Sequence, residues 1–139
     1  MGHTARFGVS IPQELVEAFD ACIGRRGYRT RSEAIRDIMR RYLVEGEWEG
    51  HTGEVVGTIT VVYDHGTPEL TQHLTDLQHR FHGSIYCSTH VHLDEHNCLE
   101  VIVLKGAGKE VQSVADRLVS TRGVKHGQLV CTTTGKALP

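Results

Sequence analysis

The chain has 139 residues and a net charge of −2 at pH 7, enough for one ordinary domain or two small ones, and it is not a generic polyanion binder. No apolar run approaches the roughly 18 residues of a membrane span, and no secretory signal opens the chain. The four cysteines are scattered without the spacing of a disulfide framework. These features predict a reduced, cytoplasmic protein that does not associate with membranes.

The charge is distributed unevenly along the chain. Residues 1–44 contain eight arginines, no lysine and five acidic residues, so their local charge is eight minus five, or +3. Residues 51–139 contain seven basic and nine acidic residues, together with nine of the ten histidines. Two segments with different chemistry are therefore expected.

The first segment begins with a short alternating pattern. Residues 5–11 alternate apolar and polar side chains, which predicts a strand with a single apolar face. Pro12 suits the first position of a following helix, which carries an apolar stripe and is expected to end near Gly24 and Gly27.

A second helix should follow at once. Thr30 and Glu33 have the spacing of a capping box, and the helix they open is expected to end near Gly46. One strand and two helices over residues 1–46 cannot bury a core alone. The physical solution is an intertwined dimer in which the strand of each chain pairs antiparallel with that of its partner.

The runs at residues 10–15 and 25–37 (SIPQEL and RRGYRTRSEAIRD) resemble a ribbon-helix-helix DNA-binding domain. The resemblance implies that the paired strands lie in the major groove of double-stranded DNA and that the outward side chains read the bases. Those positions are Arg6, Gly8 and Ser10; Gly8 departs from the family pattern, because it has no side chain for base readout.

The start of the second helix is suited to hold a DNA phosphate, because its free backbone amides point outward. The residues concerned are Thr30, Arg31 and Ser32. The alternative is that the arginines of this segment only form a solvated surface.

After an acidic, glycine-rich linker over 47–53, the remaining elements have the order of a split βαβ domain. The whole chain is therefore expected to be α+β, with a βαα unit followed by a ferredoxin-like βαββαβ domain over 54–139 that resembles the ligand-sensing ACT type. The expected elements are a strand over 54–63, a helix over 67–82, a hairpin over 84–105, a helix ending before Gly123 and a strand over 124–133. Both helices should pack on one face of the sheet.

The hairpin contains the most informative pattern in the chain. Residues 84–93 alternate like a strand, so His90 and His92 lie on one face. Residues 94–97 have the composition of a turn, and Cys98 opens the returning strand. With His92 opposite Cys98, two imidazoles and one thiolate gather on one surface.

These three side chains would supply three of the four ligands of a metal site. Imidazole and thiolate together favour zinc, copper or nickel over magnesium or calcium. The alternative is that Cys98 is a small half-buried hydrophobic residue and that His90 and His92 are solvated.

A fourth ligand can be sought by helical geometry. In the helix over 67–82, His79 lies about 180° from the apolar stripe, at 100° per residue. It points away from its own core and could reach a hairpin of another chain. His73 and His82 lie on the flanks of the stripe and are weaker candidates.

Taken together, these motifs resemble the nickel-responsive transcriptional regulator family over nearly the whole chain. The residues that carry the resemblance are Gln78-His79, His90-Val-His92 and Cys98-Leu-Glu100, with further matching stretches at 31–37, 104–106 and 122–127.

The resemblance implies one planar Ni(II) site per subunit, formed by His90, His92 and Cys98 of one subunit and His79 of its neighbour. It implies a homotetramer, built as a dimer of dimers, that represses nickel uptake genes by binding a palindromic operator. A second cation near Glu33 and Asp37 is also implied. The protein would be a regulator rather than an enzyme, with no protein partner beyond its own copies.

Two alternatives keep this architecture but change the ligand. The second domain would sense another metal such as copper, zinc or cobalt, or it would bind an amino acid as ACT-like domains often do. A metalloenzyme is poorly supported. No candidate general base lies at a characteristic spacing from the metal ligands, and a histidine as the fourth ligand would leave no coordination position open for a substrate. An antitoxin would carry a toxin-wrapping tail in place of the second folded domain.

Overall fold

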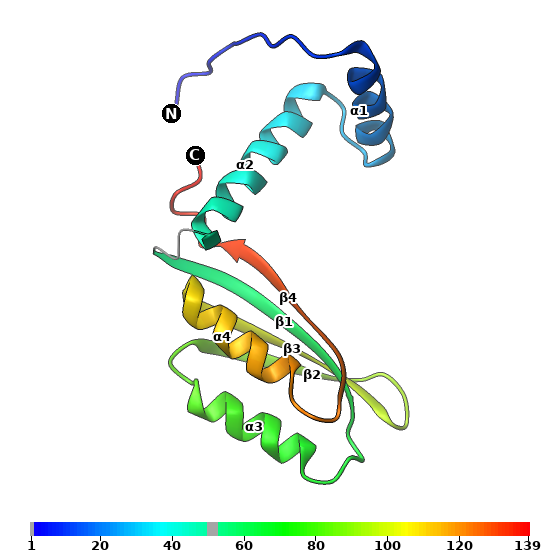
Figure 1. Ribbon diagram of the computed structural model, residues 1–139, viewed down its shortest axis with the longest axis vertical. Coiled ribbons are helices and arrows are strands. Elements are labelled where there is room, and N and C mark those ends of the chain that lie inside the picture. Colours follow the sequence, from blue (N-terminus) through cyan, green and yellow to red (C-terminus); the bar gives the residue numbers. More distant parts are fainter. Residues whose placement is uncertain (1, 50–52) are drawn as a thin grey trace. The chain divides into compact units, whose positions relative to one another are not determined.

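The structure is a computed structural model that describes residues 2–49 and 53–139. Met1 of the expected 1–46 segment and residues 50–52 of the expected linker lie outside the described residues. The chain divides into two compact units, Met1–Leu43 with Ala137–Pro139, and Val44–Lys136 (Figure 1).

The first unit contains two helices, α1 (Gln13–Arg25) and the start of α2 (Arg31–Glu49). The predicted capping box forms at the start of α2, where the Thr30 hydroxyl accepts a hydrogen bond from the Glu33 amide at 3.2 Å. The Glu33 carboxylate accepts one from the Arg29 amide at 3.2 Å. The first bond satisfies a backbone donor of the first turn, and the second ties Glu33 to Arg29, one residue ahead of the cap.

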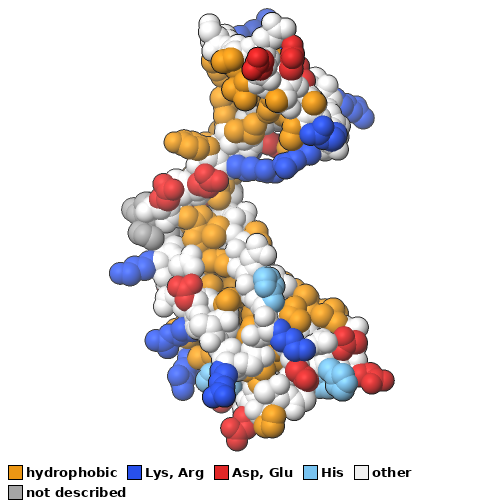
Figure 2. Space-filling view, turned by 45° about the vertical axis from the view of Figure 1, so that its right-hand side comes forward, with side chains coloured by type: hydrophobic (Ala, Val, Ile, Leu, Met, Phe, Trp, Pro, Cys, Tyr) orange, Lys and Arg blue, Asp and Glu red, His pale blue; other side chains and the backbone are white. Residues whose placement is uncertain are grey.

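The strand predicted over residues 5–11 is not formed in the single chain that the structure describes at 2–49. A strand needs a hydrogen-bonding partner, and the strand pairings among the described residues do not include residues 5–11. The apolar side chains of this segment are consequently exposed, Phe7 at 68% and Val9 at 65%. Figure 2 shows hydrophobic side chains gathered on the surface of this unit.

The second unit has the predicted βαββαβ order. Its strands form one antiparallel sheet with the order β2-β3-β1-β4. Strand β1 therefore lies in the middle of the sheet, and strand β2 of the hairpin is one of its edges. The elements are β1 (Glu54–Asp64), α3 (Leu70–Arg80), β2 (Ile85–His92), β3 (Asn97–Ala107), α4 (Gly108–Val119) and β4 (Val124–Thr133).

Both helices of this unit cover the same face of the sheet, as predicted (Figure 1). Alternate residues of β1 and β3 are buried beneath them, because side chains of a strand point to opposite faces. The core consists of Val55, Ile59, Val61, Tyr63, Leu70, Leu74, Leu77, Cys98, Ile102, Leu104, Val111, Val114, Ala115 and Leu118.

Helix α2 extends to Glu49, three residues beyond its expected end near Gly46. The reason is Trp48, whose indole packs against the core of the second unit and donates a hydrogen bond to the Thr132 carbonyl at 2.8 Å. The composition of this stretch suggested a linker, but a large aromatic side chain that finds a partner stabilises the helix around it.

Helix α3 begins at Leu70, later than the predicted start at 67. Thr67 precedes a proline, which disfavours the helical conformation at that residue. Glu69 has a left-handed conformation with φ of 64°, so it caps the right-handed helix that starts at Leu70 but cannot be one of its residues. Residues 67–69 therefore form a turn ahead of the helix.

Among the described residues, none of the helices combines the length and the apolar character that are needed to cross a membrane.

Candidate metal centre

The hairpin has the predicted register, with His92 opposite Cys98 and His90 opposite Glu100. Asp94 holds the turn, because its carboxylate accepts hydrogen bonds from the amides of His96 and Asn97 at 2.8 and 2.7 Å. The Asn97 side chain and these amides lower the pKa of Asp94 to about 2. A charged Asp94 therefore fixes the turn at neutral pH, and with it the pairing that brings the histidines to the cysteine.

The Cys98 sulfur lies 3.4 Å from the His92 Nδ1 atom. Two ligands at ordinary metal–sulfur and metal–nitrogen distances are about 3.1 Å apart at a right angle and about 3.6 Å apart at a tetrahedral angle. The observed separation lies between these values. His92 and Cys98 therefore fit as neighbouring ligands of one metal ion.

The Cys98 side chain is fully buried, with 0% exposed. Burial raises the pKa of its thiol, and the nearby carboxylates of Asp94, Asp64 and Glu100 raise it further. The thiol is consequently protonated at neutral pH in the metal-free chain, and a metal ion must displace its proton in order to bind sulfur.

The affinity of this hairpin for a metal such as nickel is therefore expected to rise with pH. Because the pKa of Cys98 is raised, each nickel ion bound near pH 7 should release about one proton from it, and affinity should increase about tenfold per pH unit until that pKa is passed. Calorimetry in buffers of different ionisation enthalpy measures this proton. The same proton count in Cys98→Ala would contradict the assignment.

His90 lies beside His92, with ring centroids 5.1 Å apart. Its Nδ1 atom is 3.3 Å from the Tyr63 hydroxyl, which donates its proton to the Glu100 carboxylate at 3.2 Å. The Tyr63 hydroxyl has only one proton, so the His90 Nδ1 atom must be the donor in its contact with the Tyr63 oxygen. The Nε2 atom of His90 then keeps a free lone pair. This arrangement, in which the second ring nitrogen is held by a protein group, is typical of metal-binding histidines.

The same network reaches helix α3. The Gln78 side chain donates a hydrogen bond to the other Glu100 carboxylate oxygen at 2.9 Å, and Glu100 is only 8% exposed. Burial and the adjacent Glu100 raise the pKa of the Tyr63 hydroxyl, so Tyr63 remains a hydrogen-bond donor. The sequence pattern did not predict this network.

His79 is not brought to His90, His92 and Cys98 of its own chain. It is exposed on α3, while Leu74 and Leu77 are buried on the opposite face. Gln78 faces its own hairpin, and the next residue of a helix points about 100° away. In this chain His79 is therefore free to contact another molecule.

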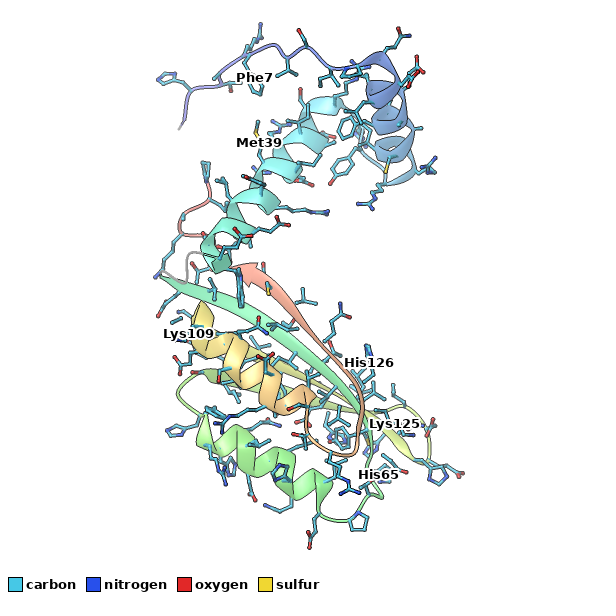
Figure 3. The ribbon with its side chains drawn as sticks, in the orientation of Figure 1. Phe7, Met39, His65, Lys109, Lys125 and His126 are labelled. Carbon is cyan, nitrogen blue, oxygen red and sulfur yellow. The ribbon has the colours of Figure 1, made fainter. Side chains whose placement is uncertain are left out.

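His65, which the sequence reasoning missed, lies beside the hairpin just after β1. The ligand atoms of His65, His92 and Cys98 all lie within 4.8 Å of one another. Figure 3 shows His65 at the end of the sheet where Lys125 also lies. The strand pairing could have predicted this position of His65. Strand β1 runs antiparallel to β3 with Tyr63 opposite Cys98, so the residues that follow β1 lie beside the hairpin turn.

The two carboxylates suggested for a second cation already have partners. Asp37 accepts hydrogen bonds from the Tyr28 hydroxyl at 2.5 Å and from Arg40 at 3.5 Å, and Glu33 accepts one from the Arg29 amide. A cation there would have to replace or share these contacts.

The residues suggested for DNA contact are exposed, including Arg6, Gly8 and Ser10. Arg31 forms a two-bonded ion pair with Asp20, at 2.8 and 2.6 Å. Its guanidinium would have to leave this exposed pair, which contributes little to stability, in order to bind a phosphate. Thr30 and Ser32 are exposed beside it at the start of α2.

Comparison with known families agrees with both units. Residues 56–132 match the family model described as the NikR C terminal nickel binding domain. Residues 5–46 match the model of ribbon-helix-helix proteins of the copG family. A ribbon-helix-helix DNA-binding domain joined to a nickel-binding domain defines a metal-responsive regulator of transcription and not an enzyme.

The chain belongs to the nickel-responsive regulator family. It is 57% identical over 138 residues to a protein of Nitratidesulfovibrio vulgaris strain Miyazaki F, covering 99% of both chains. It is 55% identical over 133 residues to a protein of Thermococcus kodakarensis, covering 96% of both. Both relatives are provisionally named nickel-responsive regulators. These matches confirm the family and the fold class that the sequence motifs predicted.

Among solved structures, an uncharacterized protein of Thermotoga maritima is similar with a TM-score of 0.51. The similarity covers 57% of this chain and 98% of that chain, at 18% sequence identity. At this identity the likeness concerns the fold alone.

Proposed function

We propose that this regulator binds one Ni(II) per subunit through His90, His92 and Cys98 of one chain and His79 of the partner subunit. The observation that carries the proposal is the close pair of the Cys98 sulfur and the His92 ring, with His90 beside it. When bound, nickel would supply a fixed link between subunits. Three imidazole nitrogens and one thiolate form a donor set that suits planar coordination of nickel.

The proposed assembly is a homotetramer made of two dimers. The apolar surface of the first unit supports a dimer of its strands, because residues such as Phe7, Val9 and Leu15 are exposed in the single chain. The uncovered sheet face and β2 edge of the second unit also carry exposed apolar side chains, including Tyr86 and Val130. Patches of this kind mark interfaces.

Nickel would favour the arrangement of the tetramer in which both strand dimers contact one palindromic operator. The shift cannot exceed the difference between the nickel affinities of the two arrangements. We infer that the outcome is repression of nickel uptake genes in the cytoplasm. A second cation at Glu33 and Asp37, at adjacent turns of α2, belongs to the same proposal.

A nickel titration followed by absorbance tests the metal half of the proposal. A thiolate-to-nickel charge-transfer band and the d–d bands of a planar site should saturate at one nickel per chain. Operator binding, measured on the same samples, should appear at the same point. If nickel saturates the protein without operator binding, or if the protein stays colourless, the proposal is wrong and another metal or another effector must be the signal.

For the DNA half, Arg6→Ala should weaken binding of the nickel-loaded protein to its operator by about 1–3 kcal/mol and relax base preference at one step. The reason is that a bidentate arginine–guanine pair reads sequence, whereas a phosphate contact does not. Arg25→Ala, which removes an exposed arginine at the end of α1, is the matched control. Equal losses for both variants would show that Arg6 contributes only charge. Binding is measured by gel shift at fixed salt.

A further inference from the structure

His65 has the features of a metal ligand although it is absent from the proposed intersubunit set. It follows β1, and its ligand atom lies within 4.8 Å of those of His92 and Cys98. All three residues belong to one chain. The group therefore exists before any partner subunit contributes.

The hydrogen bonds of His65 orient its ring for metal binding. Its Nε2 atom lies 2.8 Å from the Glu95 carbonyl oxygen. A carbonyl only accepts, so Nε2 carries the proton and Nδ1 keeps its lone pair. The His65 amide also donates to the His96 carbonyl at 3.0 Å, so both the backbone and the ring of His65 are attached to the hairpin turn. A ring held in this way is the usual state of a metal-binding histidine.

His90 differs from His65 in the free chain. Its ring contacts Tyr63 at 3.3 Å, and it is not part of the group of close donor atoms found among residues 2–49 and 53–139. In the single chain, the third donor beside His92 and Cys98 is therefore His65.

We infer that His65, His92 and Cys98 form a loading site that takes up a divalent transition metal within one chain. Three protein ligands leave the fourth coordination position open for a water molecule, as in catalytic zinc sites. In its second step the inference rests on the proposed function: nickel stays on His92 and Cys98, while His65 and water give way to His90 and to His79 of the partner subunit. No electron is transferred, and the Cys98 proton leaves to solvent when sulfur first binds.

The test uses the full-length chain with His79→Ala, in which the intersubunit site cannot close. This variant should still bind Ni(II), seen as a thiolate-to-nickel charge-transfer band. Adding His65→Ala should weaken nickel binding at least about tenfold. Loss of a residue that only supports a metal ligand already costs about 10–100-fold in affinity, and loss of a ligand itself should cost no less. Adding His73→Ala, which removes an exposed histidine of α3, is the matched control. Unchanged nickel affinity in the His65→Ala double variant would overturn the loading site.

Nitrogen NMR of the His79→Ala chain loaded with Zn(II) provides a readout that does not depend on the His65 substitution. The Nδ1 signal of His65 should move to the position of a metal-bound nitrogen. An unshifted Nδ1 would overturn the inference. In otherwise unaltered protein, His65→Ala should slow nickel uptake but leave the final spectrum unchanged, and an altered final spectrum would make His65 a permanent ligand instead.

Failure of the loading site and failure of the proposed function give different results. If Cys98→Ala removes the band while His65→Ala has no effect, only the loading site is wrong. If Cys98→Ala leaves the band unchanged, both are wrong.

Discussion

Cys98→Ala should abolish tight nickel binding and, with it, nickel-dependent operator binding. In the described part of the chain, Cys98 is the only cysteine in a group of three or more metal-ligating side chains whose ligand atoms lie within 4.8 Å of one another. Removing a group that merely supports a metal ligand costs about 10–100-fold in affinity, so losing the thiolate itself should cost at least about 100-fold. The charge-transfer band should disappear with it.

Cys87→Ala is the matched control for this variant. Cys87 lies on β2 of the same hairpin but is exposed and pairs with Val103, not with the metal-facing residues. The Cys87→Ala variant should bind nickel and operator as the unaltered protein does. If Cys98→Ala kept nickel-dependent operator binding while remaining folded by thermal unfolding, the proposed site would be rejected.

Mixing His79→Ala with Cys98→Ala should restore the planar nickel site that neither variant can complete alone. The first variant keeps an intact hairpin, and the second keeps an intact helix α3. If His79 acts on the partner's hairpin, random exchange of subunits at equal amounts should rebuild roughly a quarter of the sites. The exposed position of His79 on α3, with Gln78 turned to its own hairpin, is the reason for this expectation.

The control mixture combines His92→Ala with Cys98→Ala, whose defects lie in the same hairpin. No exchange of subunits can rebuild a complete site from these two, so the mixture should stay inactive. The complete site is measured by the d–d bands of planar nickel after subunit exchange. If the d–d bands of the His79→Ala and Cys98→Ala mixture equal the average of its two parents, His79 does not bind nickel across subunits.

Local patterns in the sequence were sufficient for the hairpin. Alternation over β2, a turn headed by Asp94 and a second alternating run led to the pairing of His92 with Cys98, which the structure has. Register in a hairpin is determined by short-range turn chemistry and by the period of two, and both can be read from neighbouring residues. The capping box at Thr30 was predicted for the same reason.

The first unit shows where a single chain departs from its sequence pattern. Residues 5–11 alternate as a strand does, yet they remain unpaired in the described chain. In the proposed dimer, the hydrogen bonds that would make a strand come from a second copy. The strand over residues 5–11 therefore stays a prediction that depends on the proposed dimer.

Motifs and periodicity are local, so the family, the order of elements and three ligand candidates, His90, His92 and Cys98, could be read from the sequence. Which distant residues come together depends on the folded chain. Tyr63, Glu100 and Gln78 join in one network, His65 comes within reach of the buried thiol, and Trp48 packs on the second unit's core. Each of these contacts depends on the order of strands and on which helix face is buried, and no window of neighbouring residues contains that information.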